Sequence, residues 1–154
     1  MAWANRRMLC GMLVAGLLAC GPALAQVAAT RQDATNMVKA AIAEIKATGA
    51  DATYAEISNP KGKYIKGDLY LVAYDMTGKV LAHGFNPSLI GRDLSKAKDP
   101  DGKAYVQERI DLAKTQKNFW QSYKYIEPTT RSLRLKDSYC ERAGDAIICG
   151  GVYH

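Results

Sequence analysis

The stretch from Gly67 to Gly84 constrains the fold most, because its pattern is that of two antiparallel strands joined by a tight turn. An apolar run, Leu69–Tyr74, is followed by a short polar segment and then by a second apolar run, Val80–Ala82. Gly78, between the two runs, can adopt the positive φ that such a turn requires. We therefore expect a β-hairpin in the middle of a sheet.

The side chains of the first strand divide between two faces, because successive residues of a strand point in opposite directions. One face is aliphatic and comprises Leu69, Leu71 and Ala73. The other comprises Tyr70, Val72 and Tyr74. The aliphatic face suits a covering helix, whereas buried phenol hydroxyls require hydrogen-bond partners. Two interpretations of the second face remain open: a packed core with satisfied tyrosines, and the wall of a binding site.

Residues 1–25 have the pattern of a secretory signal peptide. Arg6 and Arg7 are followed by the apolar run Met8–Ala19, which is shorter than the ~20 residues of a membrane span, and by Ala23-Leu24-Ala25. We expect cleavage before Gln26, which leaves one domain of residues 26–154. An alternative is a lipoprotein anchored through Cys20, since Leu17-Leu18-Ala19-Cys20 resembles a lipobox.

The charge of the expected mature chain is mild. Without residues 1–25 it holds 19 basic and 15 acidic residues, a net charge of +4. No block of like charges occurs, which argues against a nucleic-acid-binding function. We expect a periplasmic or secreted protein that does not span the membrane after cleavage.

A long amphipathic helix is expected from Thr30 to Thr48, with Thr30 as its N-cap, Asp33 in its first turn and Gly49 as its stop. Its apolar stripe comprises Met37, Ala41, Ile42 and Ile45. This stripe would cover the aliphatic face of the central strand.

Two further helices are expected. Asp51 would cap a short one that ends near Ile57, and Asp101 or Gly102 would open one that runs from Lys103 to Lys117 before Asn118. The inner stripe of the latter comprises Tyr105, Val106, Ile110 and Ala113. The irregular segment between Gly84 and Gly102 is unusually long, and such connections are often functional.

Three more strands are predicted at Phe119–Ile126, Leu135–Glu141 and Ala146–Tyr153. In the first of them, one face comprises Phe119, Gln121, Tyr123 and Tyr125, and the other comprises Trp120, Ser122, Lys124 and Ile126. Together with the hairpin they predict an α+β fold: a five-stranded antiparallel sheet with the long N-terminal helix on one face.

Cys140 and Cys149 are expected to form a disulfide, because an exported protein matures in an oxidising compartment. A two-residue loop at Gly144-Asp145 places Cys140 opposite Cys149 in a non-hydrogen-bonded pair, where side chains approach most closely. A metal site is not expected, because no Cys-x-x-Cys is present and the only histidines are His83 and His154.

The mature chain resembles single Cache domains of the second type. The resemblance is carried, in order, by 59–62, 67–70, Tyr74-Asp75, Gly78, 81–83, 87–94, 98–103, Trp120, Tyr123-Lys124, Lys136 and Tyr139. It implies an extracytoplasmic small-molecule sensor with a PAS-like sheet behind a long N-terminal helix. It also implies a ligand, associated with small organic acids, between the sheet and the irregular segment on the face away from that helix.

Two features depart from the resemblance. Family members usually feed a kinase, cyclase or chemoreceptor, whereas this chain ends at His154, so we expect a domain without its own output domain. Its expected partner is a membrane sensor kinase, chemoreceptor or transporter. The family often has tryptophan after Tyr123-Lys124, where this chain has Tyr125.

The face assignment and the resemblance together predict a set of ligand-binding residues: Tyr70, Tyr74, His83, Trp120, Tyr123, Lys136 and Tyr139. The alternation places Trp120 and Tyr123 on opposite faces, so a bulge or another assignment is needed if both are to join the site. Aromatic walls, hydroxyl donors and one ammonium suit a small carboxylate. No cofactor is expected.

Two other function classes were considered: a small periplasmic enzyme with His83 as general base, and an interaction module that docks on a membrane sensor. The sequence has no Gly-x-Ser-x-Gly, and one internal histidine does not define a triad. We therefore expect a binding domain rather than an enzyme.

Overall fold

The computed structural model describes residues 28–154. Its helices are α1 (Arg31–Thr48), α2 (Ala50–Ile57) and α3 (Tyr105–Thr115), with a 3-10 turn η1 (Pro87–Leu89). Its strands are β1 (Ile65–Lys66), β2 (Leu69–Asp75), β3 (Val80–His83), β4 (Asn118–Ile126), β5 (Leu133–Ala143) and β6 (Ala146–Tyr153). The expected signal peptide and Cys20 lie outside the described residues. Within residues 28–154, no helix is both long and apolar enough to cross a membrane.

The strands form one antiparallel sheet in the order β1-β2-β6-β5-β4, with β3 also paired to β2. The predicted α+β fold is therefore confirmed, and the sheet has a sixth strand, β1. Gly67, with φ of 64°, lets the chain reverse between β1 and β2, so that Lys66 pairs with Leu69. β2 lies inside the sheet, between β6 and β3, as the hairpin pattern predicted.

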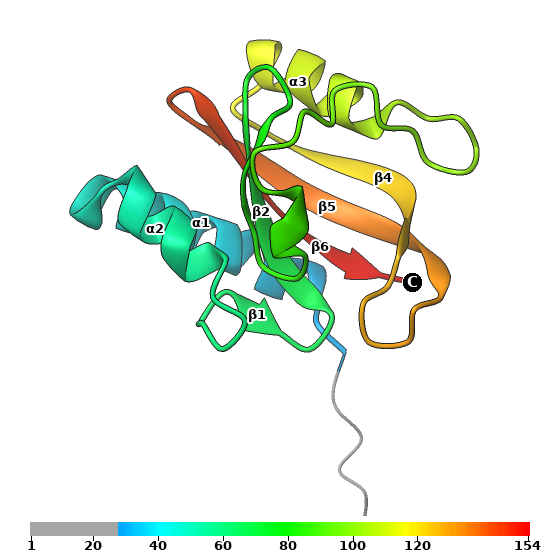
Figure 1. Ribbon diagram of the computed structural model, residues 1–154, viewed down its shortest axis with the longest axis horizontal. Coiled ribbons are helices and arrows are strands. Elements are labelled where there is room, and N and C mark those ends of the chain that lie inside the picture. Colours follow the sequence, from blue (N-terminus) through cyan, green and yellow to red (C-terminus); the bar gives the residue numbers. More distant parts are fainter. Residues whose placement is uncertain (1–27) are drawn as a thin grey trace, which may run out of the picture.

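Helices cover both faces of the sheet (Figure 1). α1 and α2 pack on one face, and α3 with the long connection from β3 packs on the other. Leu71 and Ala73 of β2 lie in the core beneath α1, whereas Tyr70 and Tyr74 lie in the core beneath α3. The predicted division of β2 into two faces is confirmed. We call the α3 side the tyrosine face, after Tyr70, Tyr74, Tyr123, Tyr125 and Tyr153.

α1 begins and ends where the sequence predicts. The Thr30 hydroxyl accepts a hydrogen bond from Asp33 N, and the Asp33 carboxylate accepts one from Thr30 N, which completes a capping box. Gly49, with φ of 94°, ends the helix. Of the expected stripe, Ala41 and Ile42 are buried, whereas Met37 and Ile45 are only partly buried. The fully buried side chains are Ala34, Val38, Ala41 and Ile42.

The predicted N-terminal boundaries of the two shorter helices were wrong. α2 begins at Ala50, with Asp51 in its first turn. α3 begins at Tyr105 rather than Lys103, because the carboxylate of Asp99 holds the preceding residues in a turn. That carboxylate accepts hydrogen bonds from Asp101 N (3.0 Å), Lys103 N (2.9 Å) and Lys124 N (3.0 Å). The Asp99 carboxylate therefore ties the turn to β4. At its other end, α3 stops at Thr115 and does not reach Lys117.

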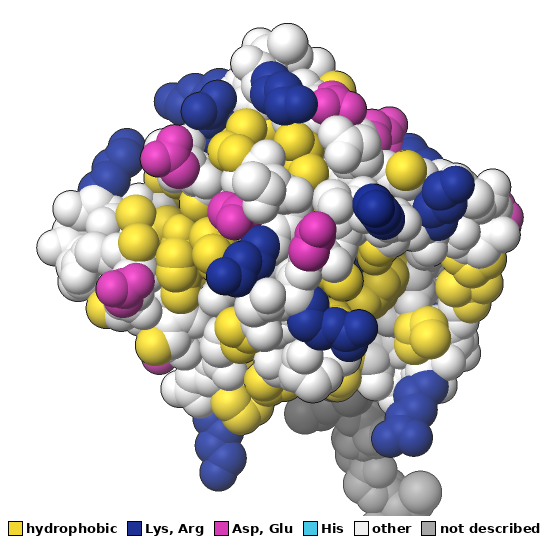
Figure 2. Space-filling model, turned by 45° about the horizontal axis from the view of Figure 1, so that its top comes forward, with side chains coloured by type: hydrophobic (Ala, Val, Ile, Leu, Met, Phe, Trp, Pro, Cys, Tyr) yellow, Lys and Arg dark blue, Asp and Glu magenta, His cyan; other side chains and the backbone are white. Residues whose placement is uncertain are grey.

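Several of the exposed charges of the described residues form salt bridges. Examples of salt bridges are Lys66–Asp33 (2.8 Å), Lys103–Glu108 (3.0 Å) and Lys124–Asp101 (2.9 Å). On the face shown in Figure 2, Lys and Arg side chains are interspersed with Asp and Glu. Such exposed pairs contribute little to stability, and they contrast with the buried cations described below.

The expected disulfide is present. Cys140 pairs with Cys149 across β5 and β6, with Cα atoms 4.2 Å apart, close to the spacing of a non-hydrogen-bonded pair. Ala143 pairs with Ala146, so the predicted two-residue loop and register are correct. The bridge is buried on the tyrosine face beneath α3.

Replacing both cysteines by alanine should lower the free energy of unfolding by roughly 2–3 kcal/mol, because the closed loop then no longer restricts the unfolded chain. Urea denaturation of the wild type and the double variant measures this difference. Equal stabilities, with the bridge verified by peptide mapping of the wild type, would contradict the assigned role.

Candidate functional site

Five of the seven predicted ligand-binding residues lie together on the tyrosine face. They are Tyr70, Tyr74, His83, Tyr123 and Lys136. The other two, Trp120 and Tyr139, lie on the α1 face. The structure therefore does not bring all seven into one site.

Trp120 and Tyr139 are directed to the α1 face by the regular alternation of their strands. The β4–β5 ladder runs without a register shift, so no bulge rotates Trp120, and Trp120 pairs with Tyr139. The guanidinium carbon of Arg31 lies 3.9 Å from the centre of the Trp120 ring. The Tyr139 hydroxyl donates to Glu141 Oε2 at 3.0 Å. Both side chains thus have partners between the sheet and α1.

Lys136 is the centre of a row of residues that crosses three strands. It pairs with Tyr123 of β4 and with Tyr153 of β6, so the three side chains share the tyrosine face. The lysine is 2% exposed. Its Nζ lies 3.8 Å from the ring centre of Tyr70, 4.8 Å from that of Tyr153 and 5.9 Å from that of Tyr125. The ammonium is therefore held against aromatic rings by cation–π contacts.

No carboxylate within the described part of the chain pairs with Lys136: it is absent from the salt bridges of residues 28–154. The pKa of Lys136 is lowered to about 8, mainly by burial and also by nearby Arg109. Tyr123 and Asp68 act in the opposite direction and raise it. A buried ammonium that is held without an ion pair is costly, so an anion would be bound strongly there.

Arg109 of α3 is a further candidate residue, which the sequence patterns did not predict. It is 1% exposed, and its guanidinium carbon lies 5.0 Å from the ring centre of Tyr74, 5.4 Å from that of Tyr123 and 5.8 Å from that of Tyr105. Its Nε and Nη2 are buried and form no hydrogen bond with the described residues. A signal was present in the sequence, because Arg109 falls one helical turn after Tyr105 on the predicted inner stripe.

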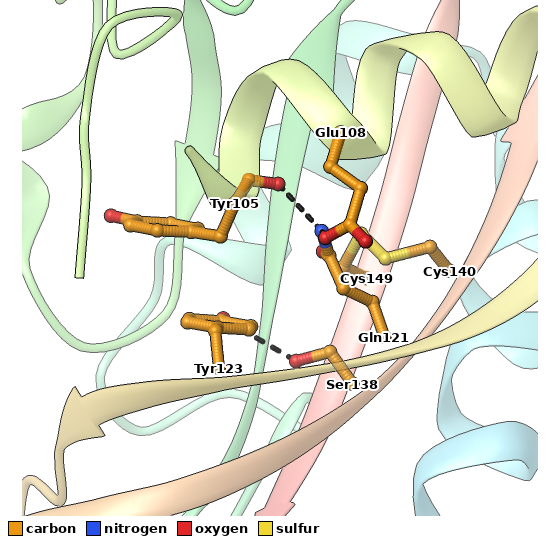
Figure 3. Close-up of a disulfide and its surroundings, with 7 residues drawn as sticks. All are labelled: Tyr105, Glu108, Gln121, Tyr123, Ser138, Cys140 and Cys149. Carbon is orange, nitrogen blue, oxygen red and sulfur yellow. Dashed lines mark hydrogen bonds between the residues drawn. A yellow bond between two sulfur atoms is a disulfide. The ribbon is translucent and has the colours of Figure 1, made fainter. Parts of the chain in front are cut away.

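Gln121 fixes α3 over β4 (Figure 3). Its Nε2 donates to the backbone oxygen of Tyr105 at 2.7 Å and to Glu108 Oε2 at 2.6 Å. The rings of Tyr105 and Tyr123 stack 4.4 Å apart with an interplanar angle of 2°. The Ser138 hydroxyl donates to the Tyr123 hydroxyl at 3.4 Å, which leaves the Tyr123 proton for another acceptor.

The electrostatic effect of the two cations is seen on Tyr123. Burial acts to raise the pKa of the Tyr123 hydroxyl, but Lys136 and Arg109 together bring it below its ordinary value. The tyrosine face is therefore an electropositive environment that favours negative charge.

His83 has a fixed role as a neutral hydrogen-bond donor. Its Nδ1 accepts hydrogen bonds from Phe85 N (3.1 Å) and Asn86 N (2.9 Å), so the ring proton is on Nε2. Its ring stacks on Tyr70, with centres 5.2 Å apart. Burial, with Lys136, lowers the pKa of His83 to about 4, so the imidazole remains neutral at ordinary pH.

The cluster therefore combines two buried cations with neutral donors. Arg109 contributes Nε–H and Nη2–H, Lys136 an ammonium, and Tyr123 and His83 one proton each. Buried polar groups are nearly always hydrogen-bonded, so free donors of this kind indicate an anionic ligand. Within residues 28–154, no group of three or more His, Cys, Asp or Glu side chains could hold a metal ion.

A pocket of about 710 Å³ lies along the outer side of α1, on the other face of the molecule, and is lined by Met37, Ala40, Ala43 and neighbouring residues. Its lysines already have partners, since Lys63 pairs with Glu44 and Lys66 with Asp33. It offers a mostly apolar wall without converging free donors. The tyrosine face is therefore the better candidate for a specific small-molecule site.

Gly150 and Gly151 of β6 make room on opposite faces of the sheet. A Cβ at Gly151 would lie 2.5 Å from both Lys136 Cε and Ser138 Oγ, so the lysine side chain passes directly over this glycine. A Cβ at Gly150 would lie 2.7 Å from Leu71 Cδ2 and 3.3 Å from Val38 Cγ2. Gly151 thus positions Lys136, whereas Gly150 lets α1 pack on the sheet.

Replacing Lys136 by methionine should raise the free energy of unfolding at pH 7 by about 1–3 kcal/mol in carboxylate-free buffer, because a buried charge is removed. The pKa of Lys136 is lower in the folded protein (about 8) than its ordinary 10.5, so the unfolded chain binds more protons between these values. The stability of the wild type should therefore rise towards that of the variant from pH 8 to pH 10.5.

Denaturant unfolding at several pH values measures this difference. Lys117→Met, at an exposed lysine, is the matched control and should show no such convergence. A Lys136→Met variant that is less stable than the wild type at pH 7 would contradict the proposed cost of burial.

Alanine substitutions at Gly150 and Gly151 should have different effects, one on anion affinity and the other on stability. Gly151→Ala displaces the end of a flexible lysine, so we expect at least a tenfold loss of anion affinity with less than about 1.5 kcal/mol loss of stability. Gly150→Ala forces apart packed side chains beneath α1 and should cost about 1–3 kcal/mol of stability instead. Thermal melts and calorimetry with propionate compare the two; the same profile for both would count against this assignment.

Comparisons with known proteins show which proteins this chain is similar to. An 88-residue segment (56% of the chain) is 34% identical to the methyl-accepting chemotaxis protein McpP of Pseudomonas putida, and it spans 16% of that protein. The fold matches the crystal structure of a methyl-accepting chemotaxis protein from Vibrio parahaemolyticus with a TM-score of 0.69, at 22% identity, over 79% of this chain and 86% of that one.

A second solved structure, described as the structural basis for carboxylic acid recognition by a Cache chemosensory domain, matches with a TM-score of 0.62 at 26% identity. It covers 79% of this chain and 86% of that one. The family model of Single Cache domain 2 matches residues 19–153. The chain therefore belongs to the Single Cache domain 2 family.

Proposed function

We propose that this protein is an extracytoplasmic receptor domain, formed by residues 26–154 after removal of a signal peptide, that binds a small organic acid as its carboxylate. The observation that carries the proposal is the burial of Arg109 and Lys136, at 1% and 2% exposure, with no salt bridge to a carboxylate of residues 28–154. A bound carboxylate would supply the acceptor that both cations need.

Arg109 has the principal role in this proposal. Its Nε–H and Nη2–H, the two groups without partners, point in parallel along one edge of the guanidinium and match the two oxygens of a carboxylate. Lys136 adds a point charge from β5, and the Tyr123 hydroxyl and His83 Nε2–H are further donors. Charge-assisted hydrogen bonds of this kind contribute roughly 1.5–3 kcal/mol each.

The comparisons support the same chemistry. Cache domains are extracytoplasmic sensors, and one structural neighbour at 26% identity is described as recognising carboxylic acids. Trp120 and Tyr139 are left out of the proposed site, because they lie on the α1 face.

A sensing role is favoured over an enzymatic one. His83 is a neutral donor at Nε2 with its Nδ1 already occupied by two backbone amides, so it is a poor general base. The proposed partner is a membrane sensor kinase, chemoreceptor or transporter. In this view the interaction-module hypothesis is compatible with ligand binding, since docking would report the occupied site.

The size of the ligand limits its affinity. An acid of four to six heavy atoms, at a ceiling of ~1.5 kcal/mol per atom, gains at most ~6–9 kcal/mol. The dissociation constant is then no tighter than roughly a few tenths of a micromolar to tens of micromolar, which suits the reporting of an abundant nutrient.

Calorimetry with acetate, propionate, lactate and pyruvate should find at least one ligand. Arg109→Met and Lys136→Met should each weaken its binding roughly 10- to 100-fold, because each removes a charge-assisted contact. Lys117→Met, the exposed control, should bind as the wild type does. Since Lys136→Met is expected to be the more stable protein, its loss of binding would not reflect unfolding.

Native mass spectrometry of protein purified from the periplasm of its source tests the same proposal without a chosen ligand. We expect the mass of a chain that begins at Gln26, with a small acid bound. Wild-type affinity in both charge variants would overturn the carboxylate assignment, and an acylated Cys20 would replace the cleaved chain by a lipoprotein.

A further inference from the structure

A separate pocket of about 340 Å³ opens beside the buried cluster. We call it the outer pocket, and it is lined by Tyr70, His83, Phe85, Asn86, Tyr125, Ile126, Pro128 and Arg131. The charge-binding residues Arg109 and Lys136 do not line it. Its volume is many times the ~30 Å³ share of one water molecule, so the smallest acids would leave most of it unfilled.

The outer pocket shares two walls, Tyr70 and Tyr125, with the surroundings of Lys136. The ring of Tyr70 lies 3.8 Å from Lys136 Nζ and 5.8 Å from the ring of Phe85. The ring of Tyr125 also faces both, at 5.9 Å from Lys136 Nζ. Tyr70 and Tyr125 therefore border both Lys136 and the outer pocket.

The chemistry of the outer pocket suits an apolar group. Phe85 is 47% exposed at its rim, although a large aromatic side chain gains by burial. Two of its polar atoms already have partners, since His83 Nδ1 accepts two backbone hydrogen bonds and Asn86 Oδ1 accepts one from Ser88. The remaining charge, on Arg131, is exposed at the rim, where an ion pair would be weak.

We propose that the ligand is a monocarboxylate with an apolar chain or ring, whose tail fills the outer pocket while its carboxylate lies between Arg109 and Lys136. This rests on the proposed carboxylate function and adds the class of acid: longer than acetate or propionate, as in medium-chain alkanoates and aryl-acetates.

The test is the dependence of affinity on chain length. Calorimetry with acetate, propionate, butyrate, hexanoate and phenylacetate should give affinities that rise roughly threefold to fourfold per added methylene, as expected for burial of about one CH₂ each. Phe85→Ala should flatten this slope. Ile90→Ala, which removes another exposed large side chain of the same connection outside the outer pocket, should leave the slope unchanged.

The outcomes separate this inference from the function on which it rests. If affinity is greatest for acetate or propionate and Lys136→Met abolishes it, the carboxylate function stands and the apolar tail is wrong. Adipate, the dicarboxylate of the same length as hexanoate, is added to the series. If adipate binds more tightly than hexanoate, a second charge is recognised at the rim and the proposal of an apolar tail is again wrong. If none of the acids binds, both proposals fail together.

Discussion

Lys136 and Arg109 are buried among tyrosines, and no carboxylate of residues 28–154 forms a salt bridge with either of them. Cation–π contacts hold Lys136 against Tyr70 and Arg109 against Tyr74 and Tyr123, but they offset only part of the cost of removing a charge from water. Binding sites commonly retain such unfavourable arrangements because a ligand completes them. The lowered pKa of Lys136, about 8, has the same physical origin.

The scaffold can hold these charges because its two faces have separate tasks. The α1 face is packed with aliphatic side chains and provides stability, and its aromatic pair Trp120 and Tyr139 belongs to that packing. On the tyrosine face, the disulfide joins β5 to β6, whereas Gln121 and the Asp99 turn tie α3 and the segment before it to β4. Adjacent glycines in β6 serve the two faces separately: Gly150 admits α1, and Gly151 admits the lysine.

Much of the fold followed from local rules. The two faces of β2, the caps of α1 and the register that joins Cys140 to Cys149 depend on strand alternation, capping and a two-residue loop, each readable from neighbouring residues. The site was predicted less completely. Arg109 does not stand out in the sequence, because an arginine on a helix usually faces solvent and its burial depends on residues far away in the chain. The start of α3 depends on bonds from Asp99 to β4, a contact between distant residues.

The carboxylate site is tested most directly by a crystal structure of the protein grown with saturating propionate. We expect the two carboxylate oxygens to lie within about 3 Å of Arg109 Nε and Nη2, with Lys136 Nζ at a similar distance from one of them. Propionate bound only elsewhere, or the two cations neutralised by movement of a protein carboxylate such as Asp68, would contradict it.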